Sequence, residues 1–466
     1  MYVFKKMLFI LVFGVGLIIQ AFAQQPSEAT QRLLERNQMF EPQIIEVSEN
    51  VYSAVGYQVS TSAMIVGDDG IIIIDPGITT PLTENVRDAY REITDKPVKA
   101  IIYTHAHGDH TNGASVYYSE GVQIWARSNY GSEAKLAQDN GYVGGVRPSN
   151  TQGFDLLPEQ KIGIGVGIPP TNRPNLGATL MADGAEPSQV PPPPSGTIEP
   201  THTFDGERQI LDIAGIHLEL VKAPGETDDQ LYVWYPQGRV VFAGDNFYQS
   251  WPNTYPLRGT ARRSIRDWIN SLDSMVQEQP EVVVPGHTTP MQNAVTVLSN
   301  YRDALQWVLD RTVEGALDKL TADELIEYTR LPEELADLDY LQDYYGSRWG
   351  TVRDIYAQEL GWFDGDVLNL HRESPMQQAQ RVVELLGGVD GLAIKASEAL
   401  NNGDSLGAAQ LADAWTKLVP NSAEAWSIMA EALTIIAEQT FNAPARNYTF
   451  SSANRARRVA EGLAEE

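Results

Sequence analysis

Hydrophobic and polar positions divide the chain into two parts with different periodicity. Up to about residue 296, short apolar runs bounded by turn residues predict β-strands, and amphipathic stretches between them predict helices. The predicted strands are 51–55, 62–66, 71–74, 98–103, 210–213, 217–221, 231–235, 240–243 and 282–284, and the predicted helices are 81–93 and 265–278, after a polar stretch of helical spacing at about 24–48. Strands that alternate with helices indicate a layered α/β architecture.

Beyond residue 296 the apolar positions take on helical spacing. Helices are predicted over 298–309, 322–329 and 352–359, and from Pro375 onward the pattern is helical throughout. Residues 408–426 look like a tetratricopeptide-type helix pair, which favours a small helical domain suited to partner or subunit contacts. We therefore predict an α/β domain over 24–300 and a helical domain over 301–466. Residues 146–200, rich in Gly and Pro, predict a long loop inside the first domain.

The N-terminus has the pattern of a secretory signal peptide. Residues 7–19 are apolar, follow Lys5 and Lys6, and precede Ala21-Phe22-Ala23. A basic start, a short apolar stretch and small residues at the cleavage site predict removal of residues 1–23, with an uncleaved anchor as the alternative. We therefore expect a secreted protein, periplasmic if the source has an outer membrane and otherwise extracellular, with no membrane span in the mature chain.

Composition narrows the chemistry. The 466 residues include no cysteine, which excludes disulfides and thiolate zinc sites, so a metal here would need His, Asp or Glu ligands. The formal net charge of −27 argues against nucleic-acid partners and anionic membranes. An anionic substrate would need a locally positive site, because the overall charge opposes its approach.

The main candidate for chemistry is the sequence Thr104-His105-Ala106-His107-Gly108-Asp109-His110, which directly follows a predicted buried strand. This H-x-H-x-D-H spacing lets one short loop supply ligands to two adjacent metal ions, and imidazole and carboxylate are ligands that zinc accepts. Three of the seven histidines of the chain lie within these residues. A solvated histidine cluster is the alternative, which the preceding buried strand disfavours.

Three later strand ends complete a candidate site. Glu226 follows Pro224-Gly225, Asp245 follows Gly244, and His287 follows Gly286. Each is a ligand-type residue beside a glycine at the end of a predicted buried strand. For Glu226 the alternative is an exposed loop carboxylate, with Asp228 or Asp229 as a rival ligand. His202, His217 and His371 lack this context and are interpreted as ordinary structural or surface residues.

This order of motifs resembles that of the metallo-β-lactamase superfamily. Most members have His at the position of Glu226, and a Glu there resembles the alkyl sulfatase family within the superfamily. The segments that support the family are 161–165, 255–259, 344–347 and 360–365, and the resemblance spans roughly residues 40–460. Departures are Gly244, where the family often has Glu, and the segments 247–253 and 348–350, which put substrate preference in question. The resemblance is to the linear alkyl sulfatase type without the lipid-binding-like C-terminal domain that many members carry.

The resemblance implies an αββα sandwich followed by a tetratricopeptide-like dimerisation domain, and a homodimer formed through residues of about 300–460. It implies two Zn²⁺ per chain, with Mn²⁺ or Fe not excluded. One ion would bind His105, His107 and Glu226, the second would bind Asp109, His110 and His287, and Asp245 would contact both. Metal-bound hydroxide would hydrolyse an alkyl sulfate ester to an alcohol and inorganic sulfate. Catalytic candidates are Asp109 to orient the water, Arg258 to bind sulfate oxygens and Tyr345 to donate a hydrogen bond.

Two other functions remain open at this point. Another hydrolase on the same scaffold, such as a β-lactamase, lactonase or thioesterase, is one, because a fold does not fix a function. The other is a non-catalytic helical-repeat binding protein with a structural metal site. The sequence leaves open whether water attacks sulfur or carbon, and which alkyl chain length and position are preferred.

Overall fold

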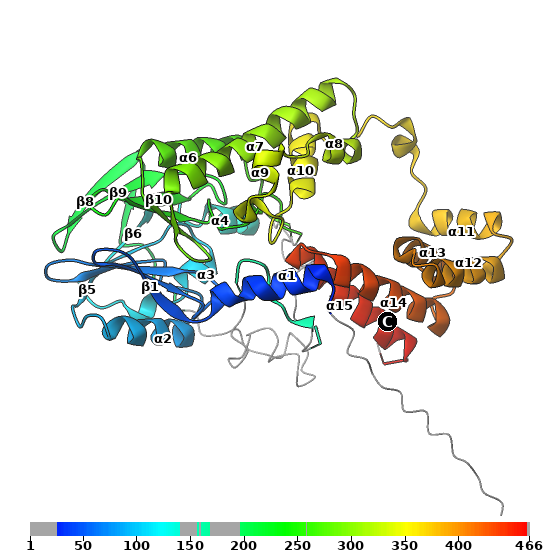
Figure 1. Cartoon of the computed structure of the whole chain (residues 1–466), viewed down its shortest axis with the longest axis horizontal. Helices are drawn as coiled ribbons and strands as arrows, with labels where there is room; N and C mark the ends of the chain where they lie inside the picture. Colours follow the sequence, from blue (N-terminus) through cyan, green and yellow to red (C-terminus); the bar gives the residue numbers. More distant parts are fainter. Residues whose placement is uncertain (1–25, 140–155, 158–159, 168–195, 258, 464–466) are drawn as a thin grey trace, which may run out of the picture.

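The computed structural model describes residues 26–139, 156–157, 160–167, 196–257 and 259–463 (Figure 1). The predicted signal peptide, most of the predicted long loop and the candidate residue Arg258 lie outside these residues. Within the part of the chain that is described, no helix is both long and apolar enough to cross a bilayer.

Two β-sheets form the centre of the first part of the chain. The first sheet has the order β1 to β7, from β1 (Gln43–Ser48), β2 (Val51–Val55), β3 (Ser62–Val66), β4 (Ile71–Ile74), β5 (Val98–Ile102), β6 (Gln123–Arg127) and β7 (His202–Phe204). The second has the order β13 to β8, from β8 (Arg208–Ile213), β9 (Ile216–Lys222), β10 (Leu231–Tyr235), β11 (Val240–Gly244), β12 (Val282–Pro285) and β13 (Met291–Gln292). The pairs from β4 to β7 and the pair β11–β12 are parallel, and the other pairs are antiparallel.

The two-residue period of the strands assigns alternate side chains to different cores. In β4, Ile72 and Ile74 belong to the core between the two sheets, whereas Ile71 and Ile73 pack with α2 (Thr80–Arg91). In β12, Val283 packs on the opposite side, with α6 (Ile265–Gln277) and α7 (Ala294–Leu317). Figure 1 shows α2 below the sheets and α6 and α7 above them. The predicted αββα sandwich is therefore confirmed.

The helices after β12 first continue the core of the sandwich. Residues of α7, α8 (Ala322–Tyr328) and α10 (Arg348–Leu360) share one buried cluster with α6 and the second sheet. The predicted domain boundary at 300/301 lies inside α7. The change to helical spacing at about residue 296 thus marks the end of the strands, while packing against the sheet continues beyond it.

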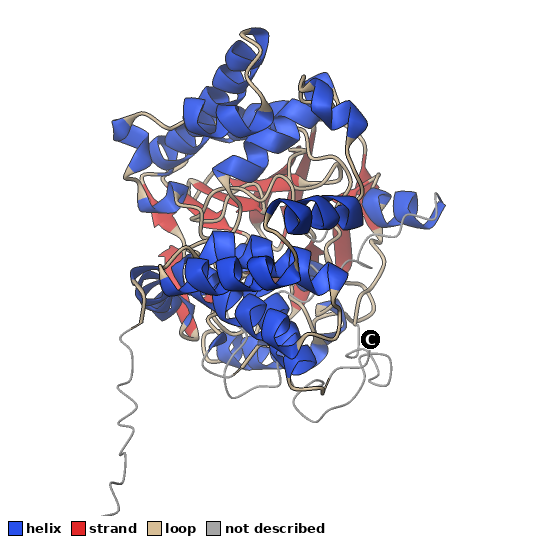
Figure 2. Cartoon of the chain, turned by 90° about the vertical axis from the view of Figure 1, so that its right-hand side faces the viewer, coloured by secondary structure: helices blue, strands red, loops and turns tan. Residues whose placement is uncertain are grey.

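A separate core joins the C-terminal helices. It is built from α11 (Pro375–Leu385), α12 (Val389–Asn401), α13 (Ser405–Leu418), α14 (Ala423–Gln439) and one residue of α15 (Ala443–Ala460). The predicted tetratricopeptide-like pair corresponds to α13 and α14. Helix α1 (Glu28–Arg36) runs beside α14, where Thr30 donates a hydrogen bond to Glu438. Figure 2, seen from the side of the helical domain, shows these helices lying in front of the strands.

Several short elements were not predicted. The polar stretch at 24–48 contains α1 but ends in β1, and β6, β7, β13 and α4 (Ser132–Asp139) had no assignment. β6 begins with Gln123 and ends with Arg127, and β7 has three residues, so neither presents an apolar run of strand length. Among the described residues the remaining short helices are α3 (Gly108–Thr111), α9 (Glu333–Ala336) and 3₁₀ turns at Asn37–Phe40, Ala114–Val116, Asp339–Leu341 and Val367–His371.

Candidate metal centre

The candidate ligands lie where strands of both sheets end at one edge of the sandwich. Parallel strands β4 and β5 end together in the first sheet, and β11 and β12 end together in the second. Backbone hydrogen bonds join the sheets at this edge, from Thr61 N to Gly286 O at 2.8 Å and from Leu231 N to Thr104 O at 2.8 Å. The loops that follow these strands therefore meet, although they are distant in sequence.

Two groups of ligand atoms form at this edge. In each group the atoms lie within 4.8 Å of one another, and the groups are His105, His107 and Asp245, and Asp109, His110 and His287. Asp245 lies between the groups: its Oδ1 is 3.2 Å from His110 Nε2, and its Oδ2 is 3.3 Å from His287 Nε2 and 3.9 Å from His105 Nε2. One carboxylate can therefore face two ions.

Hydrogen bonds fix which nitrogen each histidine presents. Nδ1 of His105 lies 3.0 Å from Thr104 Oγ1, Nδ1 of His110 lies 2.9 Å from Asp75 Oδ2, and Nδ1 of His287 lies 2.9 Å from Val59 O. With Nδ1 engaged in this way, Nε2 of each ring faces the cluster. Such outer hydrogen bonds hold a metal-binding imidazole in one tautomer and orientation. Asp75 also accepts hydrogen bonds from the Thr104 backbone and hydroxyl, which ties the ligand loop to the end of β4.

His107 has the opposite orientation. Its Nδ1 lies 3.9 Å from Glu226 Oε1, and its Nε2 lies 3.4 Å from Glu133 Oε2 on α4. The structure thus brings Glu226 beside His107. Asp228 is not buried, and Asp229 is instead engaged with Thr227 and the backbone N–H of Gly131. Coordination by Glu226 itself stays a prediction.

A buried ion pair holds Glu226 on its other side. Arg263 Nη1 lies 2.7 Å from Glu226 Oε2, and each side chain is only 2% exposed. The same Nη1 donates a hydrogen bond to Asn253 O. A buried carboxylate without a cation is costly, so Arg263 compensates the charge of Glu226 in a part of the site where water has little access.

The donor set fits divalent metal ions. His105 Nε2, His110 Nε2 and Asp245 Oδ1 are buried and make no well-aligned hydrogen bond among the described residues, although His110 Nε2 and Asp245 Oδ1 lie 3.2 Å apart. Buried polar atoms are normally satisfied, so a converging set without partners indicates a missing ligand. Six nitrogen or oxygen donors with no thiolate suit zinc, and neutral imidazole is the form that binds.

The local electrostatic environment shifts the pKa values of His105 and His110 in opposite directions. Burial lowers the pKa of His105 well below its usual value, and the neighbouring His110 and His107 lower it further. Burial also opposes the charged form of His110, yet Asp245, Asp109 and Asp75 raise the pKa of His110 well above its usual value. Protons and metal ions would therefore compete for His110, because both are drawn by the same carboxylates.

Glycines at the strand ends allow the loops to approach. Gly244 has φ +54°, a backbone conformation that residues other than glycine rarely adopt, and a Cβ there would lie 2.8 Å from Thr104 Oγ1. A Cβ on Gly286 would lie 2.0 Å from Asp245 Oδ1. A side chain at Gly286 would therefore collide with the carboxylate that lies between the two groups.

The three predicted catalytic residues differ in how close they lie to the cluster. Asp109 lies in the cluster, with its Oδ2 3.5 Å from His287 Nε2. The Tyr345 ring packs 5.5 Å from the Tyr248 ring, which in turn lies 6.0 Å from the His287 ring. Tyr345 is therefore near the cluster but separated from His287 by one aromatic side chain. Arg258 lies outside the described residues, so its role stays a prediction from the sequence.

Sequence reasoning missed four residues around the site: Asp75, Glu133, Tyr248 and Arg263. Asp75 had a signal, because Asp75-Pro76-Gly77 ends a buried strand beside the one that leads to His105. Glu133 and Arg263 carry no local signal, since Glu133 is an ordinary charged residue in the first turn of α4 and Arg263 is one just before α6. Only the tertiary structure brings them to His107 and Glu226.

Comparisons with known proteins agree with this geometry. A family model described as the metallo-beta-lactamase superfamily matches residues 55–128 and 159–287, and one described as alkyl sulfatase dimerisation matches residues 321–458. A linear primary-alkylsulfatase from Pseudomonas sp. is 33% identical over 407 residues, covering 84% of this chain and 72% of the relative. An (R)-specific secondary-alkylsulfatase from Pseudomonas sp. is 26% identical over 426 residues, covering 88% of this chain and 62% of the relative.

The fold is also found among solved structures. That of the stereoselective inverting sec-alkylsulfatase from Pseudomonas sp. superposes with a TM-score of 0.78 at 23% identity, covering 94% of this chain and 68% of that one. The sandwich and the ligand groups at its edge define a metal-dependent hydrolase of the metallo-β-lactamase superfamily. Within the superfamily, the chain belongs to the alkyl sulfatase family of sulfuric ester hydrolases.

We predict that the Glu226–Arg263 pair is strongly coupled. Arg263→Met should lower the free energy of unfolding of the metal-free protein by about 3–5 kcal/mol, because it leaves a buried carboxylate without a cation. The Arg263→Met/Glu226→Gln double variant should recover much of this loss. Urea unfolding of the metal-free protein measures both values.

Arg266→Met is the matched control for this cycle. Arg266 pairs with Glu359 at 3.1 Å, but both side chains are substantially exposed. Its loss should cost about 1 kcal/mol or less. Equal effects of Arg263→Met and Arg266→Met would contradict a coupled buried pair.

Proposed function

We propose that this protein hydrolyses alkyl sulfate esters to alcohols and inorganic sulfate at the two ligand groups around Asp245. The observation that carries the proposal is that one member of the alkyl sulfatase family has both these paired groups and an apolar pocket. Tyr345 lines that pocket, and its ring packs on the ring of Tyr248, which in turn packs on His287 of the second group. Zn²⁺ is our preferred metal, with two ions per chain. When bound, two such ions lower the pKa of a water molecule and neutralise charge on the ester.

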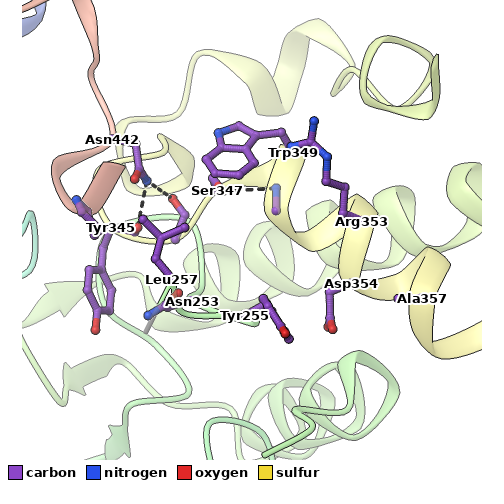
Figure 3. A pocket seen from close by; sticks show the side chains of 13 residues that line it. Asn253, Tyr255, Leu257, Tyr345, Ser347, Trp349, Arg353, Asp354, Ala357 and Asn442 are labelled. Carbon is purple, nitrogen blue, oxygen red and sulfur yellow. Dashed lines mark hydrogen bonds between the residues drawn. The ribbon is translucent and has the colours of Figure 1, made fainter. Parts of the chain in front are cut away.

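The pocket has the character that an alkyl chain requires. It has a volume of about 360 Å³ and is lined by Asn253, Tyr255, Leu257, Tyr345, Gly346, Ser347, Trp349, Gly350, Arg353, Asp354, Ala357, Asn442 and Pro444. Figure 3 shows Leu257 and Trp349 among these side chains, with Tyr345 at one side. Mainly apolar lining favours a hydrocarbon tail, because burial of each methylene group contributes about 0.8 kcal/mol.

The protein's own residues would divide the remaining work. Asp109 would orient the attacking water, since its side chain is partly exposed whereas those of His110 and His287 are almost fully buried. Tyr345 borders the pocket on the side of Tyr248 and His287, so its hydroxyl could donate a hydrogen bond to the ester group. Arg258 remains our candidate for sulfate oxygens on sequence grounds, because a guanidinium matches pairs of anionic oxygens.

The test of the proposal is sulfate release from a medium-length linear alkyl sulfate by the zinc-loaded protein. We expect turnover by the parent and a loss of at least about 100-fold in kcat/KM in Glu226→Ala, because metal binding beside His107 would be impaired. Circular dichroism and thermal unfolding verify that the variant is folded.

Parallel assays with a β-lactam, a lactone and a thioester distinguish the alternative hydrolases. Activity on one of these without sulfate release, with two metal ions bound, would overturn the substrate assignment and retain the scaffold. Two bound ions with no turnover of any substrate would favour the non-catalytic binding protein.

We predict a pH dependence of substrate binding that originates in the pocket. Burial raises the pKa of Asp354 to about 6, although a hydrogen bond from Gln358 and the charges of Arg262 and Arg263 oppose the rise. Asp354 is therefore neutral below about pH 6 and charged above it, and an apolar tail prefers the neutral form. KM for a long-chain sulfate should rise by up to about tenfold between pH 5 and pH 8.

The KM ratio of a long-chain and a short-chain alkyl sulfate isolates this effect from titrations at the metal site. Asp354→Asn should make the ratio independent of pH, because the amide is neutral throughout. A ratio that changes with pH equally in the parent and in Asp354→Asn would contradict a role for Asp354.

We also propose that the protein is a homodimer, secreted after removal of residues 1–23. The dimerisation-family match over residues 321–458 supports the first proposal. Trp362 and Leu368, which are 76% and 72% exposed, lie within that match and would be covered by a second copy. Light scattering should give twice the chain mass, and Trp362→Ser/Leu368→Ser should shift the equilibrium toward monomer. A parent that is monomeric at micromolar concentration would refute the dimer.

A further inference from the structure

We propose that Glu133 is a positioning residue: it holds His107 with Nδ1 turned toward the metal centre and connects this ligand to the loop at residues 259–261. The inference concerns the metal centre alone and does not require that the substrate be an alkyl sulfate. Glu133 is not one of the ligand residues predicted from the sequence.

The carboxylate of Glu133 makes contacts in two directions. Its Oε2 lies 3.4 Å from His107 Nε2. Its Oε1 accepts a hydrogen bond from Thr260 Oγ1 at 2.5 Å and another from Ala261 N at 3.4 Å. Because the two oxygens are used separately, the bonds to the loop keep the side chain in the rotamer that meets His107.

His107 needs such a partner more than the other three histidines of the site. The side chains of His105, His110 and His287 are 0%, 0% and 4% exposed, so packing restrains their rings. The side chain of His107 is 25% exposed. A ring at a partly open position can rotate or change tautomer unless a hydrogen bond prevents it.

The pattern of hydrogen bonds in the site supports the same conclusion. Each of the other three rings has a fixed oxygen near Nδ1, which leaves Nε2 toward the cluster. In His107 the arrangement is reversed, with Nδ1 toward Glu226 Oε1 and Nε2 toward Glu133. A carboxylate that accepts the hydrogen bond from Nε2–H fixes the tautomer in which Nδ1 carries the lone pair, and it increases the basicity of the ligand.

The position of Glu133 in the fold suits this role. It is an acidic residue in the first turn of α4, where the partial positive charge of the helix N-terminus stabilises a carboxylate. Arg263, the partner of Glu226, also contributes a favourable charge to Glu133. His107 is therefore held by a hydrogen bond to Glu133, and Glu226 is held by the opposite charge of Arg263.

Metal affinity is the first measurement that tests the proposal, with Glu133→Ala, Glu133→Gln and Thr260→Val compared with the parent. Zinc affinity of the purified, metal-stripped full chain is determined by competition with a chromophoric chelator. Glu133→Ala should lose about 10- to 100-fold in affinity for one of the two ions. Glu133→Gln should lose less, because its amide oxygen still accepts the Nε2–H hydrogen bond. Thr260→Val should lie between Glu133→Gln and the parent.

The tautomer of His107 is the second measurement, and it does not depend on activity. Nitrogen-15 NMR of the zinc-loaded protein, with His107 assigned from a His107→Gln spectrum, should show a protonated Nε2 in the parent. The metal-stripped parent should keep this tautomer, whereas Glu133→Ala without metal should give a mixture of tautomers.

Asp139→Ala is the control, because it removes an exposed carboxylate from the same helix, where Asp139 pairs with Lys135 at 2.7 Å. It should leave both readouts unchanged. Parent-like zinc affinity and His107 tautomer in Glu133→Ala would overturn the proposal. If Glu133→Ala does not fold, parent-like zinc affinity in both Glu133→Gln and Thr260→Val would overturn it equally. Neither readout uses a substrate, so failure of the sulfatase assignment would leave this result intact.

Discussion

The concentration of buried charge at one edge of the sandwich is the constraint on which the rest of the site depends. Asp245 and Glu226 are almost inaccessible to solvent, as are three of the four histidines beside them. Isolated charges in such a place are costly, and the protein compensates Glu226 with Arg263. Atoms of Asp245, His105 and His110 instead make no well-aligned hydrogen bond within the part of the chain that the structure describes. The site is thus organised for cations that the polypeptide itself does not supply.

This constraint also explains how the two sheets cooperate. Each sheet contributes ligands from loops that follow parallel strands, and backbone hydrogen bonds between the sheets set the distance between those loops. The ligands therefore follow directly from strands of the two sheets. Hydrogen bonds with Asp75, Thr104 and Val59 fix the imidazole rings of the ligand histidines. A preformed arrangement of this kind reduces the reorganisation needed when metal binds.

The sequence was most informative where chemistry and local pattern coincide. The Ile71–Ile74 run predicted the buried strand that the structure has, and the spacing of His105, His107, Asp109 and His110 predicted ligand-type residues that the structure brings together in two groups. β6 was missed because polar residues begin and end it, and β1 because its polar neighbours resemble a helix. Glu133 and Arg263 could not be identified, since what distinguishes them is a contact across 26 and 37 residues of chain and not a local pattern. The sequence also could not predict that the helices after residue 300 continue the core of the sandwich. The apolar pattern of α7 is helical in either case and does not indicate which domain the helix packs on.

Asn442 gives the helical domain a part in the site that its fold alone would not suggest. Its side-chain amide donates to the carbonyls of Tyr345 and Gly346, at 2.8 and 3.0 Å, and to that of Asp343 at 3.1 Å. The same residue is the N-cap of α15, and it lies beside Tyr345 in the wall of the pocket (Figure 3). Hydrogen bonds from the N-cap of the last helix thus fix the wall of the pocket that contains Tyr345. The two domains are for this reason not independent units. Recombination that replaced the C-terminal helices with those of a relative would also replace the side chain that holds this wall, and the shape of the pocket would change with it.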